Sequence, residues 1–226
     1  MCGIIAAASE RNVGKLLVQG LHKMEYRGYD SAGIALHQND QIAHLRTLGK
    51  VKLLEEKMIA EKPKSKLGIA HTRWATHGEP SEENAHPHKS NERIYIVHNG
   101  IIENYIELKD YLKKEGYSFS SQTDSELIAH MLEYFLNQGN TMIDSMYLTK
   151  EKLEGAYAIA AIDREDNSNI IIARNKSPLL IGIGTDEILA ASDPLAIGQL
   201  TNEFIFLEDG DVAEISAQSF EIYDDS

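Results

Sequence analysis

The only cysteine of the chain, Cys2, directly follows Met1. A lone cysteine is ordinarily a small buried hydrophobic residue, and one thiol can form neither an intrachain disulfide nor a zinc site built on several thiolates. Its position gives it another use. Once Met1 is removed, Cys2 carries a nucleophilic thiol and an α-amine of pKa about 8. That amine can serve as base to the thiol and then as acid to a departing nitrogen, as the cleavage of an amide requires.

Attack on an amide creates an oxyanion, which needs fixed hydrogen-bond donors. Asn99 offers a side-chain amide, and Gly100 offers a backbone N–H that a ligand can approach without interference from a Cβ. Both follow a predicted strand at residues 94–98, so a turn there could aim them at one point. A plain Asn-Gly turn between strands explains the same pair, and from these two residues alone the turn is favoured.

An amino-acid substrate also presents a carboxylate and an ammonium group. Arg73 can bind a carboxylate through paired N–H bonds, and Asp124 can accept from an ammonium. Each has an alternative interpretation that the sequence leaves open: Arg73 as a surface cation, and Asp124 as the N-cap of a following helix.

Five histidines gather in the same part of the sequence: His71, His77, His86, His88 and His98. Their spacing matches neither a helical His-x3-His pair nor a site with paired thiolates, so we expect no metal. They are better interpreted as loop residues whose hydrogen bonds hold a substrate pocket.

The charge balance limits the partners. The chain has 22 basic and 35 acidic side chains, a formal net charge of −13. Such a field repels phosphate backbones and anionic lipid, so we expect no binding to nucleic acid or membrane surfaces. No apolar run reaches membrane-spanning length and no signal-peptide pattern opens the chain, which predicts a cytoplasmic protein.

Hydrophobic periodicity predicts one α+β domain over residues 1–226. Helical spacing appears at residues 13–24, 104–114 and 125–136, the last with Thr123 or Asp124 as its cap. Strand patterns occupy the rest of the chain between Gly and Asp punctuation. The predicted strands cover residues 3–8, 31–37, 41–48, 66–72, 94–98, 157–163, 170–174, 179–184, 187–191, 204–207 and 212–215. Helices grouped between many strands favour a layered α+β fold over a doubly wound parallel sheet.

Long ordered motifs resemble a known family. They lie at residues 1–4 (MCGI), 25–35 (EYRGYDSAGIA), 68–78 (GIAHTRWATHG), 98–104 (HNGIIEN) and 123–126 (TDSE). Together they are similar to the N-terminal glutaminase domain of the glutamine–fructose-6-phosphate aminotransferases, which are class II glutamine amidotransferases. The likeness covers essentially the whole chain.

The resemblance implies an N-terminal nucleophile (Ntn) hydrolase fold, with four αββα layers and two packed antiparallel sheets. It implies Cys2 as the nucleophile, with Asn99 and Gly100 forming the oxyanion hole. It places Arg27 and Gly28 as support near the catalytic terminus.

The same motifs imply the substrate contacts. Arg73 would hold the carboxylate of L-glutamine and Asp124 its ammonium group. Thr76 and His77 would line the pocket, and Trp74 would lie on a loop that closes over it. No cofactor is implied.

The family resemblance also concerns the rest of the enzyme. It implies that the ammonia goes to fructose 6-phosphate in two sugar-phosphate isomerase domains, in a homo-oligomeric full-length enzyme. We expect the present chain, which ends at Ser226, to be an excised domain or fragment without them. Two other functions remain open: hydrolysis of a different amide, which would leave Arg73 and Asp124 unpaired, and a catalytically silent interaction domain, in which Met1 would be retained.

Overall fold

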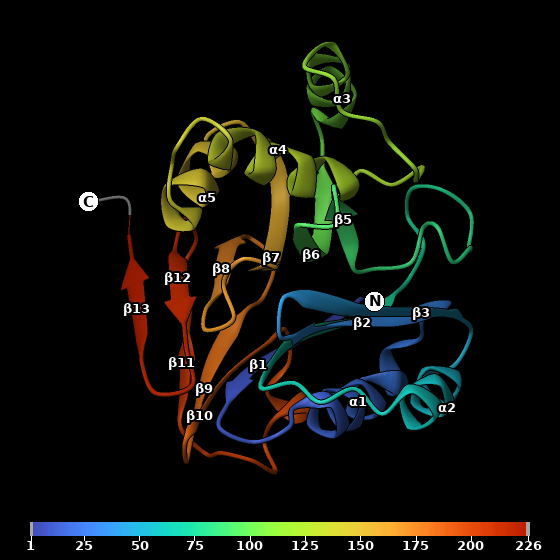
Figure 1. Cartoon of the computed structure of the whole chain (residues 1–226), viewed down its shortest axis with the longest axis vertical. Coiled ribbons are helices and arrows are strands. Elements are labelled where there is room, and N and C mark those ends of the chain that lie inside the picture. The colour runs from blue at the N-terminus through green and yellow to red at the C-terminus, as the bar shows by residue number, and fades with distance from the viewer. Residues whose placement is uncertain (1, 225–226) are drawn as a thin grey trace.

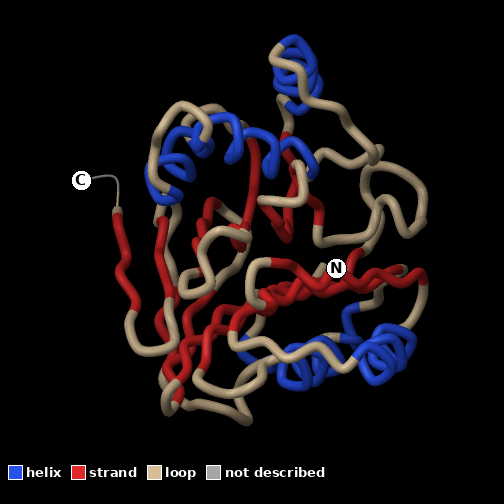
Figure 2. Tube along the Cα trace, viewed as in Figure 1, coloured by secondary structure: helices blue, strands red, loops and turns tan. Residues whose placement is uncertain are grey.

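Two antiparallel sheets packed face to face form the centre of the computed structural model, which describes residues 2–224 (Figures 1 and 2). The first sheet has seven strands in the order β11-β9-β10-β1-β4-β2-β3, so β1 lies in the middle. In that order the strands are Phe204–Phe206, Leu180–Gly184, Glu187–Ala191, Gly3–Ser9, Leu67–Arg73, Ser31–Gln38 and Gln41–Leu48.

The second sheet has six strands in the order β13-β12-β8-β7-β6-β5. In that order they are Phe220–Tyr223, Val212–Ile215, Ile170–Asn175, Gly155–Asp163, Ile94–Ile102 and His88–Ser90. Strand β5 pairs only with the first residues of β6, from Ile94 to Ile96. The later part of β6, which carries Asn99 and Gly100, therefore has β7 on one side and no β5 partner on the other.

Helices cover the outer face of each sheet. Figure 1 shows α1 (Gly14–Lys23) and α2 (Val51–Glu61) on one side of the molecule. On the other side lie α3 (Tyr105–Lys114), α4 (Glu126–Leu136) and α5 (Met142–Lys150). The four-layer αββα arrangement expected from the sequence is confirmed.

The alternation of side chains along a strand explains why both faces of each sheet are buried. In β1, Ile4 and Ala6 face the core between the two sheets, whereas Ile5 and Ala7 face α1. Because β1 lies between β10 and β4 and apolar side chains cover both of its faces, the start of β1 next to Cys2 lies in the middle of the sheet rather than at an edge.

Several predicted boundaries were wrong. Asn99 and Gly100 lie within β6, not in a turn after it. Helix α4 has Ser125 as its N-cap, without a side-chain cap bond, so neither Thr123 nor Asp124 caps it. Helices α2 and α5 and strands β5 and β13 were missed.

The missed helices have a physical explanation. Helix α2 buries only Val51 and Leu54, and α5 buries only Ser145, Met146 and Thr149, so neither shows a clear apolar stripe. Within residues 2–224, no helix has both the length and the apolar character needed to cross a membrane.

Candidate active site

The thiol of Cys2 lies at the start of the central strand β1, beside the backbone of Trp74. Its Sγ accepts a hydrogen bond from the Trp74 N–H at 3.3 Å and donates to the Trp74 carbonyl oxygen at 3.6 Å. Burial raises the pKa of the thiol above its ordinary value, although the Trp74 N–H and the charge of Arg73 oppose this effect. The thiol is therefore protonated at neutral pH and needs a base before it can attack.

The carbonyl of Cys2 is held by two side chains from other elements. Its oxygen accepts from Arg27 Nη1 at 3.3 Å and from Asn99 Nδ2 at 3.2 Å. Arg27 is fixed in turn by an ion pair with Asp193 at 3.5 Å and a bond to Ser192 Oγ at 3.5 Å. The predicted support role of Arg27 thus has a definite geometry, because Arg27 ties Cys2, which directly precedes β1, to the segment after β10.

Gly100 occupies a backbone position that other residues rarely adopt, with φ at +132°. A Cβ there would lie 2.0 Å from the carbonyl oxygen of Ala156 on β7. The close approach of β7 therefore requires glycine at this position. The interpretation of Asn99 and Gly100 as an ordinary hairpin turn is excluded, since they belong to the ladder with β7.

The edge of β6 next to Asn99 points toward polar partners. The His98 N–H donates to His86 Nδ1 at 3.2 Å, and the Ile102 N–H donates to Asp124 Oδ2 at 2.8 Å. Because N–H groups two residues apart in a strand point to the same side, we expect the Gly100 N–H between them to face this edge as well.

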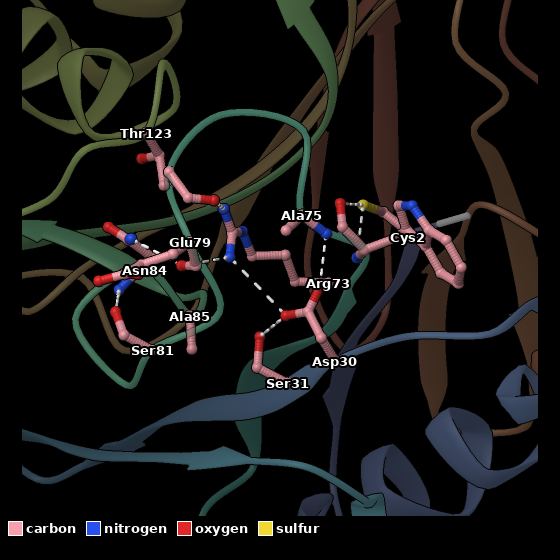
Figure 3. A network of polar contacts seen from close by, with 12 residues as sticks. Cys2, Asp30, Ser31, Arg73, Ala75, Glu79, Ser81, Asn84, Ala85 and Thr123 are labelled. Atoms are coloured by element: carbon pink, nitrogen blue, oxygen red, sulfur yellow. Dashed lines mark hydrogen bonds and ion pairs between the residues drawn. The ribbon is translucent and has the colours of Figure 1, made fainter.

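The segment after β4 is organised by Arg73 and Asp30. Arg73 is buried and donates to the carbonyl oxygens of His77, Gly78 and Glu79. Its Nη1 lies 3.7 Å from Asp30 Oδ1, while Asp30 Oδ2 accepts from the Ala75 N–H at 2.5 Å (Figure 3). The interpretation of Arg73 as a surface cation is wrong.

Two other residues of this segment, Trp74 and His77, lie beside Gly28 and Asp124. The exposed ring of Trp74 packs over Gly28, where φ is +73° and a Cβ would lie 2.8 Å from the ring. Thr76 is exposed, and His77 is half-buried, with Nδ1 3.9 Å from Asp124 Oδ1. The Trp74 carbonyl thus lies beside the thiol, whereas the Asp124 carboxylate lies beside His77.

Asp124 is buried just before α4, and one of its oxygens accepts the Ile102 N–H. Its other oxygen faces His77. The structure therefore brings both candidates for recognition of an amino-acid head, Arg73 and Asp124, to the segment that contains His77. All ten predicted site residues belong to this one region or to its immediate supports.

Four of the five histidines are buried rather than loop residues at a surface. Burial lowers the pKa values of His71 and His88 to about 3 and that of His86 well below its ordinary range. It also lowers the pKa of His98, although the charge of Asp124 opposes this. Among residues 2–224 no group of three or more His, Cys, Asp or Glu side chains is arranged to hold a metal ion.

Sequence reasoning missed several supporting residues. Asp30 stands inside the motif at residues 25–35 without a predicted role, and no motif points to Ser192 or Asp193. Ser192 Oγ accepts the Ile4 N–H at 2.9 Å, and Asp193 binds both Arg27 and the Tyr26 hydroxyl. Only the strand pairing of β1 with β10 reveals that residues 190 positions away along the chain support Cys2.

Comparisons with known proteins agree with this geometry. The model of the glutamine amidotransferase domain family matches residues 71–199, more than half of the chain. The glutamine–fructose-6-phosphate aminotransferase (isomerizing) of Haemophilus ducreyi is 50% identical over 224 residues, which are 99% of this chain and 37% of that protein. The enzyme of the same name from Vibrio parahaemolyticus is 49% identical, with the same coverage. The chain thus spans just over a third of the length of these curated relatives.

Solved structures share the fold. The glutamine phosphoribosylpyrophosphate amidotransferase of Bacillus subtilis, complexed with ADP and GMP, matches the whole chain and 49% of its own length, with a TM-score of 0.85 and 25% identity. A glutamine aminotransferase class-II domain protein from Silicibacter pomeroyi matches over the full length of both chains, with a TM-score of 0.65 and 13% identity. These matches confirm the Ntn-type class II amidotransferase fold. On the match of its sequence to the family model, the chain belongs to the glutamine amidotransferase domain family.

Proposed function

We propose that the chain, once it begins at Cys2, hydrolyses the side-chain amide of L-glutamine to glutamate and ammonia. The observation that carries the proposal is the contact between Cys2 and its proposed oxyanion donor, in which Asn99 Nδ2 lies 3.2 Å from the Cys2 carbonyl oxygen. A side-chain amide has two N–H groups, so one can hold Cys2 while the other is directed at the substrate.

The reaction has two halves. The α-amine of Cys2 takes the thiol proton, and the thiolate adds to the amide carbon to give a tetrahedral oxyanion held by Asn99 and Gly100. The ammonium group then returns a proton to the leaving nitrogen, so that ammonia departs and a thioester remains. Water, activated by the same amine, hydrolyses the thioester to glutamate and frees the thiol.

Substrate recognition in this proposal uses the residues around Asp124. The Asp124 oxygen that faces His77 accepts from the substrate ammonium, and Arg73 attracts its carboxylate. Because Arg73 also binds loop carbonyls, the carboxylate would share or replace those partners. Thr76 and His77 line the pocket, and the Trp74 segment closes it. Because Arg73 and Asp124 also have partners within the chain, the preference for glutamine over another amide is supported by the match to the glutamine amidotransferase family.

The acceptor is a further part of the proposal. Because the relatives are glutamine–fructose-6-phosphate aminotransferases and the chain spans 37% of their length, we propose that the ammonia is used to convert fructose 6-phosphate to glucosamine 6-phosphate. The isomerase domains, which this chain does not include, would bind that sugar phosphate. The full-length enzyme would be a homo-oligomer in the cytoplasm, a location consistent with a single cysteine and no intrachain disulfide.

The direct test is glutamate and ammonia release by the chain beginning at Cys2, compared with its Cys2→Ala variant. We expect the variant to retain the urea-unfolding midpoint and lose glutamine hydrolysis, because it removes the only thiol. Substantial ammonia release by Cys2→Ala would show that another nucleophile operates. With fructose 6-phosphate added, the chain alone should still form no glucosamine 6-phosphate, and detection of that product would refute the division of labour.

A further inference from the structure

His71 contacts the proposed oxyanion donor from inside the sandwich. It lies on β4 and is fully buried, and its Nε2 is 2.9 Å from Asn99 Oδ1 and 3.0 Å from the carbonyl oxygen of His98. The ring stacks on His86, with centroids 4.0 Å apart and an interplanar angle of 20°. Two hydrogen bonds and one stacking contact therefore fix the position of the imidazole.

These contacts determine which way the Asn99 amide points. A backbone carbonyl only accepts, so Nε2 of His71 must carry hydrogen where it meets His98. The Asn99 atom facing the same Nε2 must then be the amide oxygen. It follows that Asn99 Nδ2 faces the Cys2 carbonyl, where an acceptor also lies at 3.2 Å. The orientation of this amide is thus set at both ends by groups that cannot exchange roles.

We propose that His71 is a positioning residue for glutamine hydrolysis, which holds the Asn99 side-chain amide with its N–H groups toward the reacting carbonyl. The inference rests on the proposed function, because it requires Asn99 to stabilise the oxyanion. His71 touches neither the thiol nor the substrate in this role. It acts only through Asn99, and this sets it apart from a general acid or base.

The chemical state of His71 suits a fixed donor. Burial lowers its pKa to about 3, so the ring is neutral throughout the pH range of an enzyme assay. Its Nδ1 is buried and has no hydrogen-bond partner among the described residues. An unpaired acceptor at Nδ1 agrees with the single ring hydrogen being on Nε2, where it is donated to the His98 carbonyl oxygen and Asn99 Oδ1.

The test compares variants that keep or remove the donor. Glutamine can place an N–H close to the Nε2 position of histidine, so His71→Gln should retain most of the turnover. His71→Leu should lower kcat by about tenfold, less than the loss for removing an oxyanion donor outright, with KM for glutamine little changed. All variants are measured in the chain beginning at Cys2.

A matched control is His37→Leu. His37 is also buried, and its Nε2 contacts the carbonyl oxygen of Arg164 at 2.7 Å. It lies toward the far end of β2, four residues from Gly33, which pairs with His71, so the control removes a similar bond about 13 Å away along the strand. We expect a comparable loss of stability in urea and an unchanged kcat.

The double variant His71→Leu/Asn99→Ala separates positioning from general damage. If His71 acts through Asn99, the double variant has the kcat of Asn99→Ala alone, since no amide remains to be held. If the reductions of kcat in the two single variants multiply in the double variant, or if His71→Leu has a normal kcat, the inference is overturned while the role of Asn99 stays intact. A normal kcat in Asn99→Ala instead refutes the role of Asn99 as an oxyanion donor, and absence of glutamine hydrolysis by the unaltered chain beginning at Cys2 refutes the proposed function itself.

Discussion

Gly100→Ala should disable the proposed site through a backbone displacement. The added Cβ would lie 2.0 Å from the Ala156 carbonyl oxygen, whereas ordinary contacts begin at 3.4 Å. The obstacle is the backbone of β7, which cannot rotate away as a side chain could. The two strands must therefore separate by about 1.4 Å at the residue proposed to donate to the oxyanion.

The size of the effect follows from that shift. A misplacement of about 1 Å at a reacting centre can cost about 100-fold in rate, so we expect kcat to fall by at least that factor. The φ of +132° and the overlap with β7 each cost roughly 1–3 kcal/mol, for a total loss of folding stability of about 2–6 kcal/mol. Turnover of glutamine by the chain beginning at Cys2 and urea unfolding measure the two quantities.

Gly116→Ala is the matched control. Gly116 also has a positive φ, +94°, but an added Cβ there meets no heavy atom within 4 Å among the described residues. We expect a cost of about 1–2 kcal/mol from the backbone conformation and no change in kcat. If Gly100→Ala keeps a kcat within about twofold of the unaltered chain while remaining folded, Gly100 does not position the oxyanion.

Three other predictions follow from the site. Asn99→Ala should lower kcat by about 10²–10³, whereas Arg73→Ala should mainly raise KM, because it removes a partner used in both ground and transition states; an effect of Asn99→Ala on KM alone would contradict its role. A diazo-ketone analogue of glutamine should label Cys2 rapidly only after removal of Met1, as peptide mass mapping of both forms can show; equal rates would rule out the amine as base. Burial lowers the pKa of His71 to about 3, so between pH 6.5 and 3 the unfolded chain binds a proton that the folded chain does not. The free energy of unfolding therefore decreases as the pH is lowered through this range. This imidazole alone should remove about 2 kcal/mol between pH 7.5 and 5, and a flat urea-unfolding profile over that range would disprove its burial as a neutral ring.

The fold was predictable where apolar periodicity was strong. Strand β1 has apolar residues at every position from Ile4 to Ala8, and α4 buries nearly its whole length, so both stood out in the sequence. Helix α2 rests on only two buried side chains, Val51 and Leu54, and its remaining positions resemble an exposed segment. Periodicity detects burial, so it misses elements that bury little.

The boundary of β6 was missed for a different reason. Asn99 and Gly100 are residues that ordinarily end strands, and local propensity predicts a turn there. The pairing of β6 with β7 continues through both residues because glycine, which has no Cβ, fits at position 100 against the carbonyl of Ala156. A sequence shows the permissive glycine but not the neighbouring strand that requires it.

The site residues were predicted through motifs, whereas their partners required the fold. Cys2 and Asn99 are 97 positions apart, and only the packing of the two sheets brings them within a hydrogen bond. Arg73 was expected to face a substrate, yet its buried guanidinium also holds the loop carbonyls beside it. Asp30 could have been suspected from its motif, but its bond to Ala75 depends on how the loop folds back.

The structure also narrows the choice of base for the thiol. The histidines between residues 71 and 98 are the obvious alternative bases, and His71 is hydrogen-bonded to the proposed oxyanion donor. With a pKa of about 3, its imidazole would take a proton from a thiol of ordinary pKa about 8.5 at a cost of about 7.5 kcal/mol. Moreover, its Nε2 faces two acceptors and must already carry hydrogen.

An α-amine of pKa about 8 would take the same proton at a cost of less than about 1 kcal/mol, and it is covalently held beside the thiol. Burial raises the pKa of the Cys2 thiol further and makes a nearby base more necessary. The low basicity of His71 therefore strengthens the case that cleavage after Met1 creates the general base. While Met1 is attached, that nitrogen is a peptide amide without useful basicity, and the two forms of the chain should differ in chemistry although they share one fold.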